Sequence, residues 1–313
     1  MSDIKSAAIL GTGTMGPGMG AVLARAGLKV ALYDVNTEAL EKAKGTAKIA
    51  AGVLERLAVP EQGSGELRFE SDLEAAVKDV DLVVEAIPEK LELKQQVLGD
   101  LEPLIREDTI IASNTSGIPI TKIGDGLKHP GRLVGWHWSN PPQLIPMNEV
   151  IVGEQTAPEV TAAIEDLTRH IGYEPVTLKK EVPGFVENRV LYAIMRECLA
   201  LLDEGVVDAE GLDLCVKWGI GYKLAVVPPI QLLDMAGLDI YTSVASFLNQ
   251  DLSNEAGISK TATDLRDQGR LGIKSGGGFF DYTPERIAEL GAARAAALVG
   301  VRKVLESQNG NKA

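Results

Sequence analysis

The sequence predicts an α/β protein in which a Rossmann-type, doubly wound sheet domain is followed by a smaller all-helical domain. Short apolar runs alternate with helical segments in the first part of the chain, which is typical of a parallel sheet covered on both faces. After the Pro183-Gly184 dipeptide only helical patterns follow. A chain of 313 residues is long enough for two domains. We therefore expect a sheet domain at residues 1–180 and a helical domain at residues 181–313.

The N-terminal segment carries the pattern of a strand, a helix and a second strand. Residues 6–10 form a short apolar run, residues 15–26 suit a helix, and residues 29–33 form another apolar run. Thr37 is in a position to cap a following helix that extends to about Leu57. The chain therefore begins with a βαβ unit, whose two strands are parallel.

The later elements continue this alternation and then change to helices alone. Further strands are expected at residues 81–86, 109–112, 133–138, 148–152 and 174–178, with helical or turn segments between them. Helices of the second domain are expected at residues 186–204, 208–217, 230–248 and 283–306.

Charge and composition exclude several classes of protein. The chain has 31 lysines and arginines against 44 aspartates and glutamates, a net charge of −13. Such a surface repels a polyanion, and no basic cluster runs against the total, so nucleic-acid binding is not expected. Hydrophobic residues make up 45% of the chain and charged residues 24%, which argues against long disordered segments.

The N-terminus and the cysteines indicate a cytoplasmic protein without a membrane anchor. Residues 7–24 are uncharged, but five glycines and Pro17 interrupt them, so a membrane-spanning helix is not expected. The pattern of a secretory signal is also missing. Cys198 and Cys215 have neither CxxC nor Cys/His ligand spacing, which fits small buried side chains in a reducing compartment. We expect neither a disulfide nor a metal site.

A glycine-rich motif, GTGTMG at residues 11–16, lies between the first strand and the first helix. This is the context that a dinucleotide-binding GxGxxG motif requires. The first glycine allows a tight turn, the second lets the backbone approach a pyrophosphate, and the third lets helix and strand pack closely. The N–H groups at the helix start then receive the phosphate charge. The expected cofactor contacts here are Gly11, Gly13, Thr14, Met15 and Gly16.

Asp34 reinforces this motif. It stands 18 residues after Gly16, at the end of the second strand, where a carboxylate can accept hydrogen bonds from the adenosine ribose. Val35 and Asn36 follow, so no basic residue is present to bind a 2′-phosphate, and NAD is favoured over NADP. The alternative is a plain glycine turn followed by a capping aspartate, which predicts no thermal stabilisation by NADH.

Only three histidines could carry a proton near neutral pH. His129 precedes a Pro-Gly turn and His170 ends a polar helix, so both are expected at the surface. His137 lies at the end of an apolar strand, between Trp136 and Trp138. It is either a buried histidine with a purely structural role or the candidate for general acid–base chemistry.

Several motifs occur in a fixed order along nearly the whole chain. They are GTGTMG at 11–16, VEAI at 84–87, SNTS at 113–116, GWHWSNP at 135–141, PGFVENR at 183–189, LLDMAGLD at 232–239 and KSGGGFF at 274–280. Together they resemble the 3-hydroxyacyl-CoA dehydrogenase family. The resemblance implies a dehydrogenase that uses NAD and assembles as a homodimer through the helical domain.

The resemblance also implies roles for individual residues. His137 would be the general base that takes the alcohol proton, and Glu149 would hold its imidazole ring. Ser116 and Asn188 would contact the reacting oxygen of the substrate. Taken without the family, Glu149 is an ordinary strand-end charge, Ser116 could end a strand, and Asn188 could cap a helix.

Three further residues match positions that line the cofactor cleft of the family. These are Glu85, Lys94 and Asn114. Considered by themselves, the two charged residues are equally consistent with solvated surface side chains.

Two departures from the family pattern bear on the substrate. Acyl-CoA members carry a longer, lysine-rich extension after the second strand, whereas residues 45–70 here hold three basic and four acidic residues. Because CoA brings several negative charges, this segment suits it poorly. Lys223 stands where the family has a proline. It could pair with a substrate carboxylate or be a plain surface lysine.

With these departures, the chain resembles one branch of the family, whose members act with NAD on an aldehyde of a pyridine carboxylate in vitamin B6 breakdown. A flat, anionic, CoA-free substrate would suit Trp136, Trp138 and Lys223. We therefore expect a dehydrogenase of a small CoA-free hydroxy or aldehyde compound. The alternatives are a short-chain 3-hydroxyacyl-CoA dehydrogenase and a non-catalytic NAD-binding protein.

Overall fold

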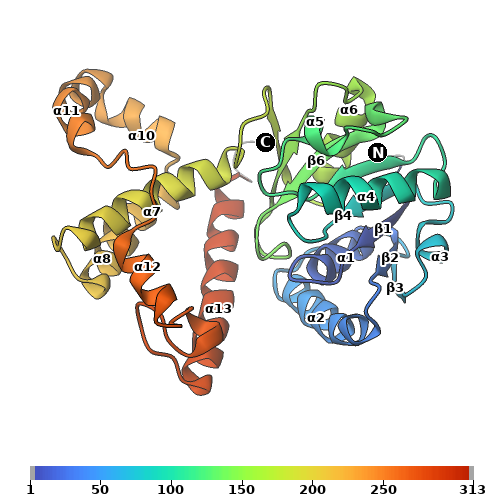
Figure 1. The fold of residues 1–313 in the computed structure, drawn as a ribbon, viewed down its shortest axis with the longest axis horizontal. Coiled ribbons are helices and arrows are strands. Elements are labelled where there is room, and N and C mark those ends of the chain that lie inside the picture. The colour runs from blue at the N-terminus through green and yellow to red at the C-terminus, as the bar shows by residue number, and fades with distance from the viewer. Residues whose placement is uncertain (1–3, 310–313) are drawn as a thin grey trace. The chain divides into compact units, whose positions relative to one another are not determined.

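The computed structural model describes residues 4–309 and confirms a sheet domain followed by helices (Figure 1). The chain divides into two compact units, Met1–Arg189 and Val190–Ala313. This division lies within helix α7 (Glu187–Asp203), after the boundary expected at residue 180. The first turn of α7 therefore belongs with the sheet unit.

The first unit is built on one eight-stranded sheet in the order β3-β2-β1-β4-β5-β6-β7-β8. Strands β1 to β6 are parallel to one another, β7 is antiparallel to β6, and β8 is parallel to β7. The strands are β1 (Ser6–Leu10), β2 (Lys29–Tyr33), β3 (Glu66–Glu70), β4 (Leu82–Glu85), β5 (Ile110–Ser113), β6 (Leu133–Trp138), β7 (Met147–Ile151) and β8 (Glu174–Leu178).

The sheet corrects the expected pattern at two places. The pattern favours a parallel sheet, but only residues 139–146 join β6 to β7. This connection is too short for a parallel crossover, so these strands form a hairpin. Strand β3 was not expected, because its sequence, ELRFE, is interrupted by charges. It pairs with β2 as an edge strand, where charged side chains can reach water.

Helices cover both faces of the sheet, as a doubly wound fold requires. Buried side chains of α1, α2 and α6 pack on one face, and those of α3, α4 and α5 pack on the other. Asn36 rather than Thr37 caps α2, because the Asn36 Oδ1 atom accepts hydrogen bonds from the amides of residues 38 and 39. The helices are α1 (Gly16–Arg25), α2 (Thr37–Arg56), α3 (Leu73–Val77), α4 (Leu91–Leu101), α5 (Ile120–Ile123) and α6 (Pro158–His170).

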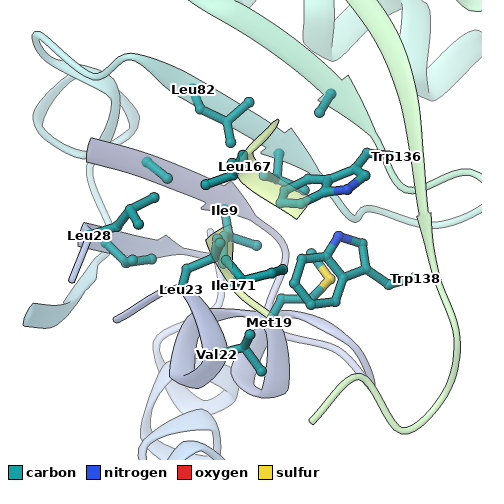
Figure 2. Close-up of a cluster of buried hydrophobic side chains, with 14 of the residues drawn as sticks. Ile9, Met19, Val22, Leu23, Leu28, Leu82, Trp136, Trp138, Leu167 and Ile171 are labelled. Carbon is teal, nitrogen blue, oxygen red and sulfur yellow. The ribbon is translucent and has the colours of Figure 1, made fainter. Parts of the chain in front are cut away.

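Successive side chains of β6 point to opposite faces of the sheet, where two separate hydrophobic cores lie. Trp136 and Trp138 lie in the core that includes Met19 of α1, with their ring centroids 4.7 Å apart (Figure 2). His137 points to the opposite face, where its ring centroid lies 5.8 Å from that of Phe185, a member of the second core. The histidine is thus turned away from both tryptophans.

The second unit is helical, as expected, with differences in detail. The single helix expected at residues 230–248 is broken at Gly237, whose φ of +96° ends one helix before the next begins. Helix α12 was not expected. Cys215 is exposed and Cys198 partly buried, so the expectation of two buried cysteines was wrong for Cys215. Beyond α7 the helices are α8 (Ala209–Cys215), a π-helix (Val216–Gly221), α9 (Tyr222–Leu224), α10 (Pro229–Ala236), α11 (Leu238–Asp251), α12 (Lys260–Asp267) and α13 (Pro284–Asn309).

Among residues 4–309, no helix has the length and apolar character needed to span a bilayer.

Candidate active site

The order of strands reverses between β1 and β4, and the glycine motif lies at this point. Gly11 follows β1 with a φ of +111°, a conformation that favours glycine. A Cβ atom added to Gly11 would lie 2.5 Å from the carbonyl oxygen of Ala86, the residue after β4. Ligands of doubly wound sheets bind outside the carboxyl ends of the strands at such a reversal. The motif therefore occupies the expected position for a dinucleotide.

The other two glycines fit a bound pyrophosphate in different ways. A Cβ atom on Gly16 would lie 2.1 Å from the Gly11 carbonyl oxygen, so close packing of α1 on β1 needs a glycine there. A Cβ atom on Gly13 would have no neighbour within 4 Å, so this side of the loop is open to a ligand. Thr14 is exposed, and Met15 precedes α1 without a side-chain cap. The N–H groups at the start of α1 can thus receive a phosphate.

Asp34 is held at the end of β2 by the same loop. Its Oδ2 atom accepts hydrogen bonds from the backbone N–H of Thr12 at 3.0 Å and from the Thr12 hydroxyl at 2.6 Å. Its Oδ1 atom accepts one from the Asn36 amide at 2.9 Å. Burial acts to raise the pKa of the Asp34 carboxyl, but these hydrogen bonds outweigh it and hold the pKa below its usual value. An ionised carboxylate here suits ribose hydroxyls and repels a 2′-phosphate.

His137 and Glu149 form a buried pair near the carboxyl end of β6. They lie directly opposite each other in the antiparallel ladder of β6 and β7, so both side chains emerge on the same face. The His137 Nδ1 and Glu149 Oε2 atoms are 2.8 Å apart, and the residues are 7% and 1% exposed. Among the described residues, the other ring nitrogen, Nε2, has no hydrogen-bond partner. That nitrogen is available for a substrate proton.

The second oxygen of Glu149 is held by the beginning of α7. Its Oε1 atom accepts hydrogen bonds from the backbone N–H groups of Val186 at 2.8 Å and of Glu187 at 3.1 Å. Burial acts to raise the pKa of the Glu149 carboxyl. The hydrogen bonds from His137 and from the two amides are stronger together and lower that pKa. Glu149 is therefore ionised at neutral pH and can stabilise a protonated imidazole.

A strained turn directs these amides at the carboxylate. Gly184 has a φ of +75° and Phe185 a φ of +51°. The left-handed region costs a non-glycine residue about 1–2 kcal/mol. Phe185 is fully buried, so packing of its ring beside His137 holds the backbone in this conformation. Strain at this turn is thus linked to the placement of the dyad.

Ser116 and Asn188 are brought together by the structure. The Asn188 amide donates to the Ser116 carbonyl oxygen at 3.0 Å. The Ser116 backbone N–H donates at 2.9 Å to Glu89 Oε1, which also accepts from the Thr115 hydroxyl at 2.6 Å. Asn114, next in the same loop, accepts from the Trp138 backbone N–H at 2.9 Å. These bonds tie the loop after β5 to the end of β6 and to α7.

Glu85 and Lys94 form an ion pair beneath this loop. Lys94 Nζ lies 2.7 Å from Glu85 Oε1, and the two residues are 1% and 0% exposed. Glu85 also accepts from the Ser113 hydroxyl at 2.6 Å and from the Ile87 amide at 2.9 Å. The alternative of two solvated charges was therefore wrong. The two charges are therefore satisfied by partners within the protein.

The two tryptophans expected at the substrate lie in the core on the other face of the sheet. Trp138 is 2% exposed and packs in the core beneath α1, since strand alternation turns it away from the His137 face. Trp136 shares that core (Figure 2). The expectation that the tryptophans receive a flat substrate is corrected accordingly. Lys223 is exposed in α9 of the second unit.

Three further residues of the site were missed in the sequence. Glu89 connects Lys94, at 3.2 Å, to the loop that holds Ser116. Thr12 orients Asp34, and the backbone of Glu187 holds Glu149. Glu89 stands four residues after Glu85 and five before Lys94, a spacing that could have indicated a shared charge network. The other two act partly through backbone groups, which carry no sequence signal.

Two family models match the chain. The model for the 3-hydroxyacyl-CoA dehydrogenase NAD binding domain matches residues 6–182, and the model for the C-terminal domain matches residues 184–282. The 5-formyl-3-hydroxy-2-methylpyridine 4-carboxylate 5-dehydrogenase of Mesorhizobium japonicum is 54% identical over 307 residues, which cover 97% of this chain and 99% of the relative.

Solved structures agree with these matches. A crystal structure of 5-formyl-3-hydroxy-2-methylpyridine 4-carboxylic acid 5-dehydrogenase, described as an NAD+ dependent dismutase, is 53% identical with a TM-score of 0.95 and covers 97% of this chain and 99% of its own. The (S)-3-hydroxybutyryl-CoA dehydrogenase from Ralstonia eutropha is 30% identical with a TM-score of 0.71, over 90% of this chain and all of its own. From its motifs, its dyad and these matches, the chain belongs to the 3-hydroxyacyl-CoA dehydrogenase family and is an NAD-dependent dehydrogenase.

Proposed function

We propose that this protein oxidises the aldehyde group of a small, CoA-free pyridine carboxylate, with His137 as the general base. The observation that carries the proposal is the 54% identity, over nearly the full length of both chains, to a 5-formyl-3-hydroxy-2-methylpyridine 4-carboxylate 5-dehydrogenase. The His137–Glu149 dyad supplies the proton chemistry that such a reaction needs.

The aldehyde would react as its hydrate, a geminal diol. The glycine loop and Asp34 would hold NAD, which would supply the acceptor for the hydride of the diol carbon. His137 Nε2 takes the proton of one diol hydroxyl, and the electron pair of that O–H bond becomes the new C=O bond of the carboxylic acid. Glu149 keeps Nδ1 protonated and stabilises the imidazolium that forms. In the reverse sense, the same imidazolium can return its proton to an alkoxide.

Ser116 and Asn188 are proposed to orient the oxygen that loses its proton. Among the described residues the Ser116 hydroxyl has no hydrogen-bond partner, while its backbone is held from both sides by Glu89 and Asn188. A donor with a fixed backbone and a free hydroxyl can stabilise charge that develops on the substrate oxygen. The cofactor would be held by the glycine loop through its phosphates and by Asp34 through its ribose.

The segment after β2 supports a substrate without CoA. Helix α2 runs directly into the loop that leads to β3, with no further helix between them. Arg68, one of the three basic residues of this segment, is engaged by Glu70 at 2.5 Å and by the carbonyl oxygen of Ala75 at 3.0 Å. Few basic groups remain here for the phosphates of CoA.

The remaining proposals concern Lys223 and the helical unit. We propose that the exposed Lys223 ammonium pairs with the substrate carboxylate. We also propose a homodimer formed through the helical unit, because α7 and α11 expose large apolar side chains such as Val190, Tyr192 and Phe247. A cytoplasmic location stays a prediction.

Comparison of two substrates tests the proposed function. Purified protein is incubated with NAD+ and 5-formyl-3-hydroxy-2-methylpyridine 4-carboxylate, and separately with NADH and acetoacetyl-CoA. We expect the aldehyde to be consumed and the carboxylic acid to form, with or without an equal amount of alcohol, and little oxidation of NADH by acetoacetyl-CoA. His137→Ala serves as the control for contaminating activity. Efficient reduction of acetoacetyl-CoA without aldehyde turnover would favour a short-chain 3-hydroxyacyl-CoA dehydrogenase instead.

A further inference from the structure

We propose that Glu187 is a positioning residue for His137, a second carboxylate that acts with Glu149 to stabilise the protonated imidazole. The inference rests on the proposed function, because it assigns His137 the role of base. Glu187 is the first residue of α7 and its role was not anticipated from the sequence.

Glu187 reaches the dyad through both its backbone and its side chain. Its N–H donates to Glu149 Oε1 at 3.1 Å, and its carboxylate accepts a short hydrogen bond from the Ser139 hydroxyl. One ring nitrogen of His137 and one carboxylate oxygen each of Glu149 and Glu187 lie within 4.8 Å of one another. Two acids from two different elements therefore face one imidazole.

The two carboxylates differ in how far their charge is already compensated. Both oxygens of Glu149 are engaged, one by His137 and one by two backbone amides. Glu187 has the Ser139 hydroxyl and the start of α7 beside it, and within the described residues it forms no ion pair. Much of its negative charge is thus left to act on the imidazole.

No other described charge is paired with His137. Its own strand, β6, contributes the hydroxyl of Ser139 just beyond the strand end, and the turn before α7 contributes the uncharged ring of Phe185. On β4 and α4, Glu85 and Lys94 are paired with each other. The charged groups that the described contacts place around His137 are therefore Glu149 from β7 and Glu187 from α7.

A proton suits this cluster better than a metal ion. A cation bound by the three side chains would compete with the donors that are already present at both oxygens of Glu149. A proton on His137 needs no such rearrangement, because the pair at 2.8 Å is already aligned for it.

The pH dependence of oxidation tests this proposal. Glu187→Gln keeps the shape of the side chain and removes its charge. A charge within about 4–6 Å typically shifts a titration by about 1 unit or more. We therefore expect the midpoint of the acid limb of kcat/KM to fall by about one pH unit, while Glu187→Asp keeps the wild-type midpoint. A Glu159→Gln variant removes an exposed charge from the first turn of a different helix, α6, and is the control.

A second readout keeps this test independent of the substrate. The imidazole of His137 is titrated by NMR in the wild type, Glu187→Gln and Glu159→Gln, after assignment among the three histidines. The midpoint is expected to fall by about one pH unit in Glu187→Gln alone. Equal midpoints in Glu187→Gln and Glu159→Gln would overturn the role of Glu187. If the shift is seen but no aldehyde is oxidised, the proposed function fails and the electrostatic role of Glu187 stands.

Discussion

Two buried acid–base pairs stand at the same edge of the sheet, and they are built for opposite purposes. Lys94 and Glu85 are 2.7 Å apart, and His137 and Glu149 are 2.8 Å apart. All four side chains are buried. The first pair joins an ammonium to a carboxylate, whereas the second contains an imidazole, the side chain that most often serves in general acid–base chemistry. One pair is fixed and the other can accept and release a proton.

The two pairs also differ in the hydrogen-bond partners around them. The Lys94 ammonium is enclosed by Glu85, Glu89 and the Ile87 carbonyl oxygen, so its hydrogen-bonding capacity is used within the protein. His137 has one ring nitrogen bound by Glu149 and one left open within the described residues. A buried charge that never changes must be fully satisfied. A general base must keep one position free.

The largest expected effect comes from breaking the fixed pair. Lys94→Met leaves the Glu85 carboxylate buried without its partner, and loss of one member of a buried pair costs about 3–5 kcal/mol of folding free energy. Chemical denaturation of the variant measures this loss. The double variant Glu85→Gln, Lys94→Met is expected to recover part of it, because no charge is then left unpaired. If Lys94→Met is as stable as the wild type, the pair is not buried as described.

Breaking the second pair is expected to affect chemistry before stability. His137→Ala removes the proton acceptor and is expected to lower turnover of the aldehyde by about 10²-fold or more. Binding of NADH, followed by fluorescence titration, should stay close to the wild-type affinity because His137 is not part of the glycine loop. Full turnover in this variant would remove His137 from the mechanism.

Asp34 sharpens the comparison, because it is an acid held by neutral donors alone. Asp34→Ala removes the acceptor for the ribose hydroxyls, and the expected loss in NADH affinity is about tenfold. The same change removes the repulsion of a 2′-phosphate, so NADPH should lose less affinity than NADH. Isothermal titration with both cofactors measures the ratio. An unchanged preference for NADH would show that another group selects the cofactor.

The smallest expected effect is on acid stability. The pKa of Glu149 is lowered below 4.5 in the folded protein, so its ionised form stabilises the fold above that pH. This contribution is lost as the pH falls through the lowered folded-state pKa. The stability difference between wild type and Glu149→Gln, measured by urea denaturation, should therefore shrink from pH 6 to pH 3. A difference that stays constant would indicate that the carboxylate is not titrated in this range.

Local patterns were enough to predict how the proposed cofactor residues lie relative to one another. The glycine motif and Asp34 are separated by one helix and one strand, so their geometry follows from a single βαβ unit. The dyad was different. His137 and Glu149 meet because β6 and β7 are antiparallel, and the sequence pattern favoured a parallel sheet. Only the family resemblance identified this pair.

Backbone groups and strand faces set the limit of sequence prediction at this site. The amides of Val186 and Glu187 hold Glu149 because Phe185 adopts a positive φ, which its sequence does not indicate. Trp138 was expected at the substrate, yet alternation along β6 places it in the core with Met19. The tryptophans and His137 are neighbours in sequence but face opposite sides of the sheet.

The register of the β6–β7 hairpin decides whether a folded molecule can be active. A slip by one residue would turn Glu149 toward the tryptophan side and leave His137 without its acid. In either case an ionisable side chain would be buried without a partner. The free-energy cost of such burial is large compared with the net stability of a typical folded protein. Molecules with a misaligned hairpin are thus expected to aggregate or be degraded, so the soluble fraction should be uniformly competent.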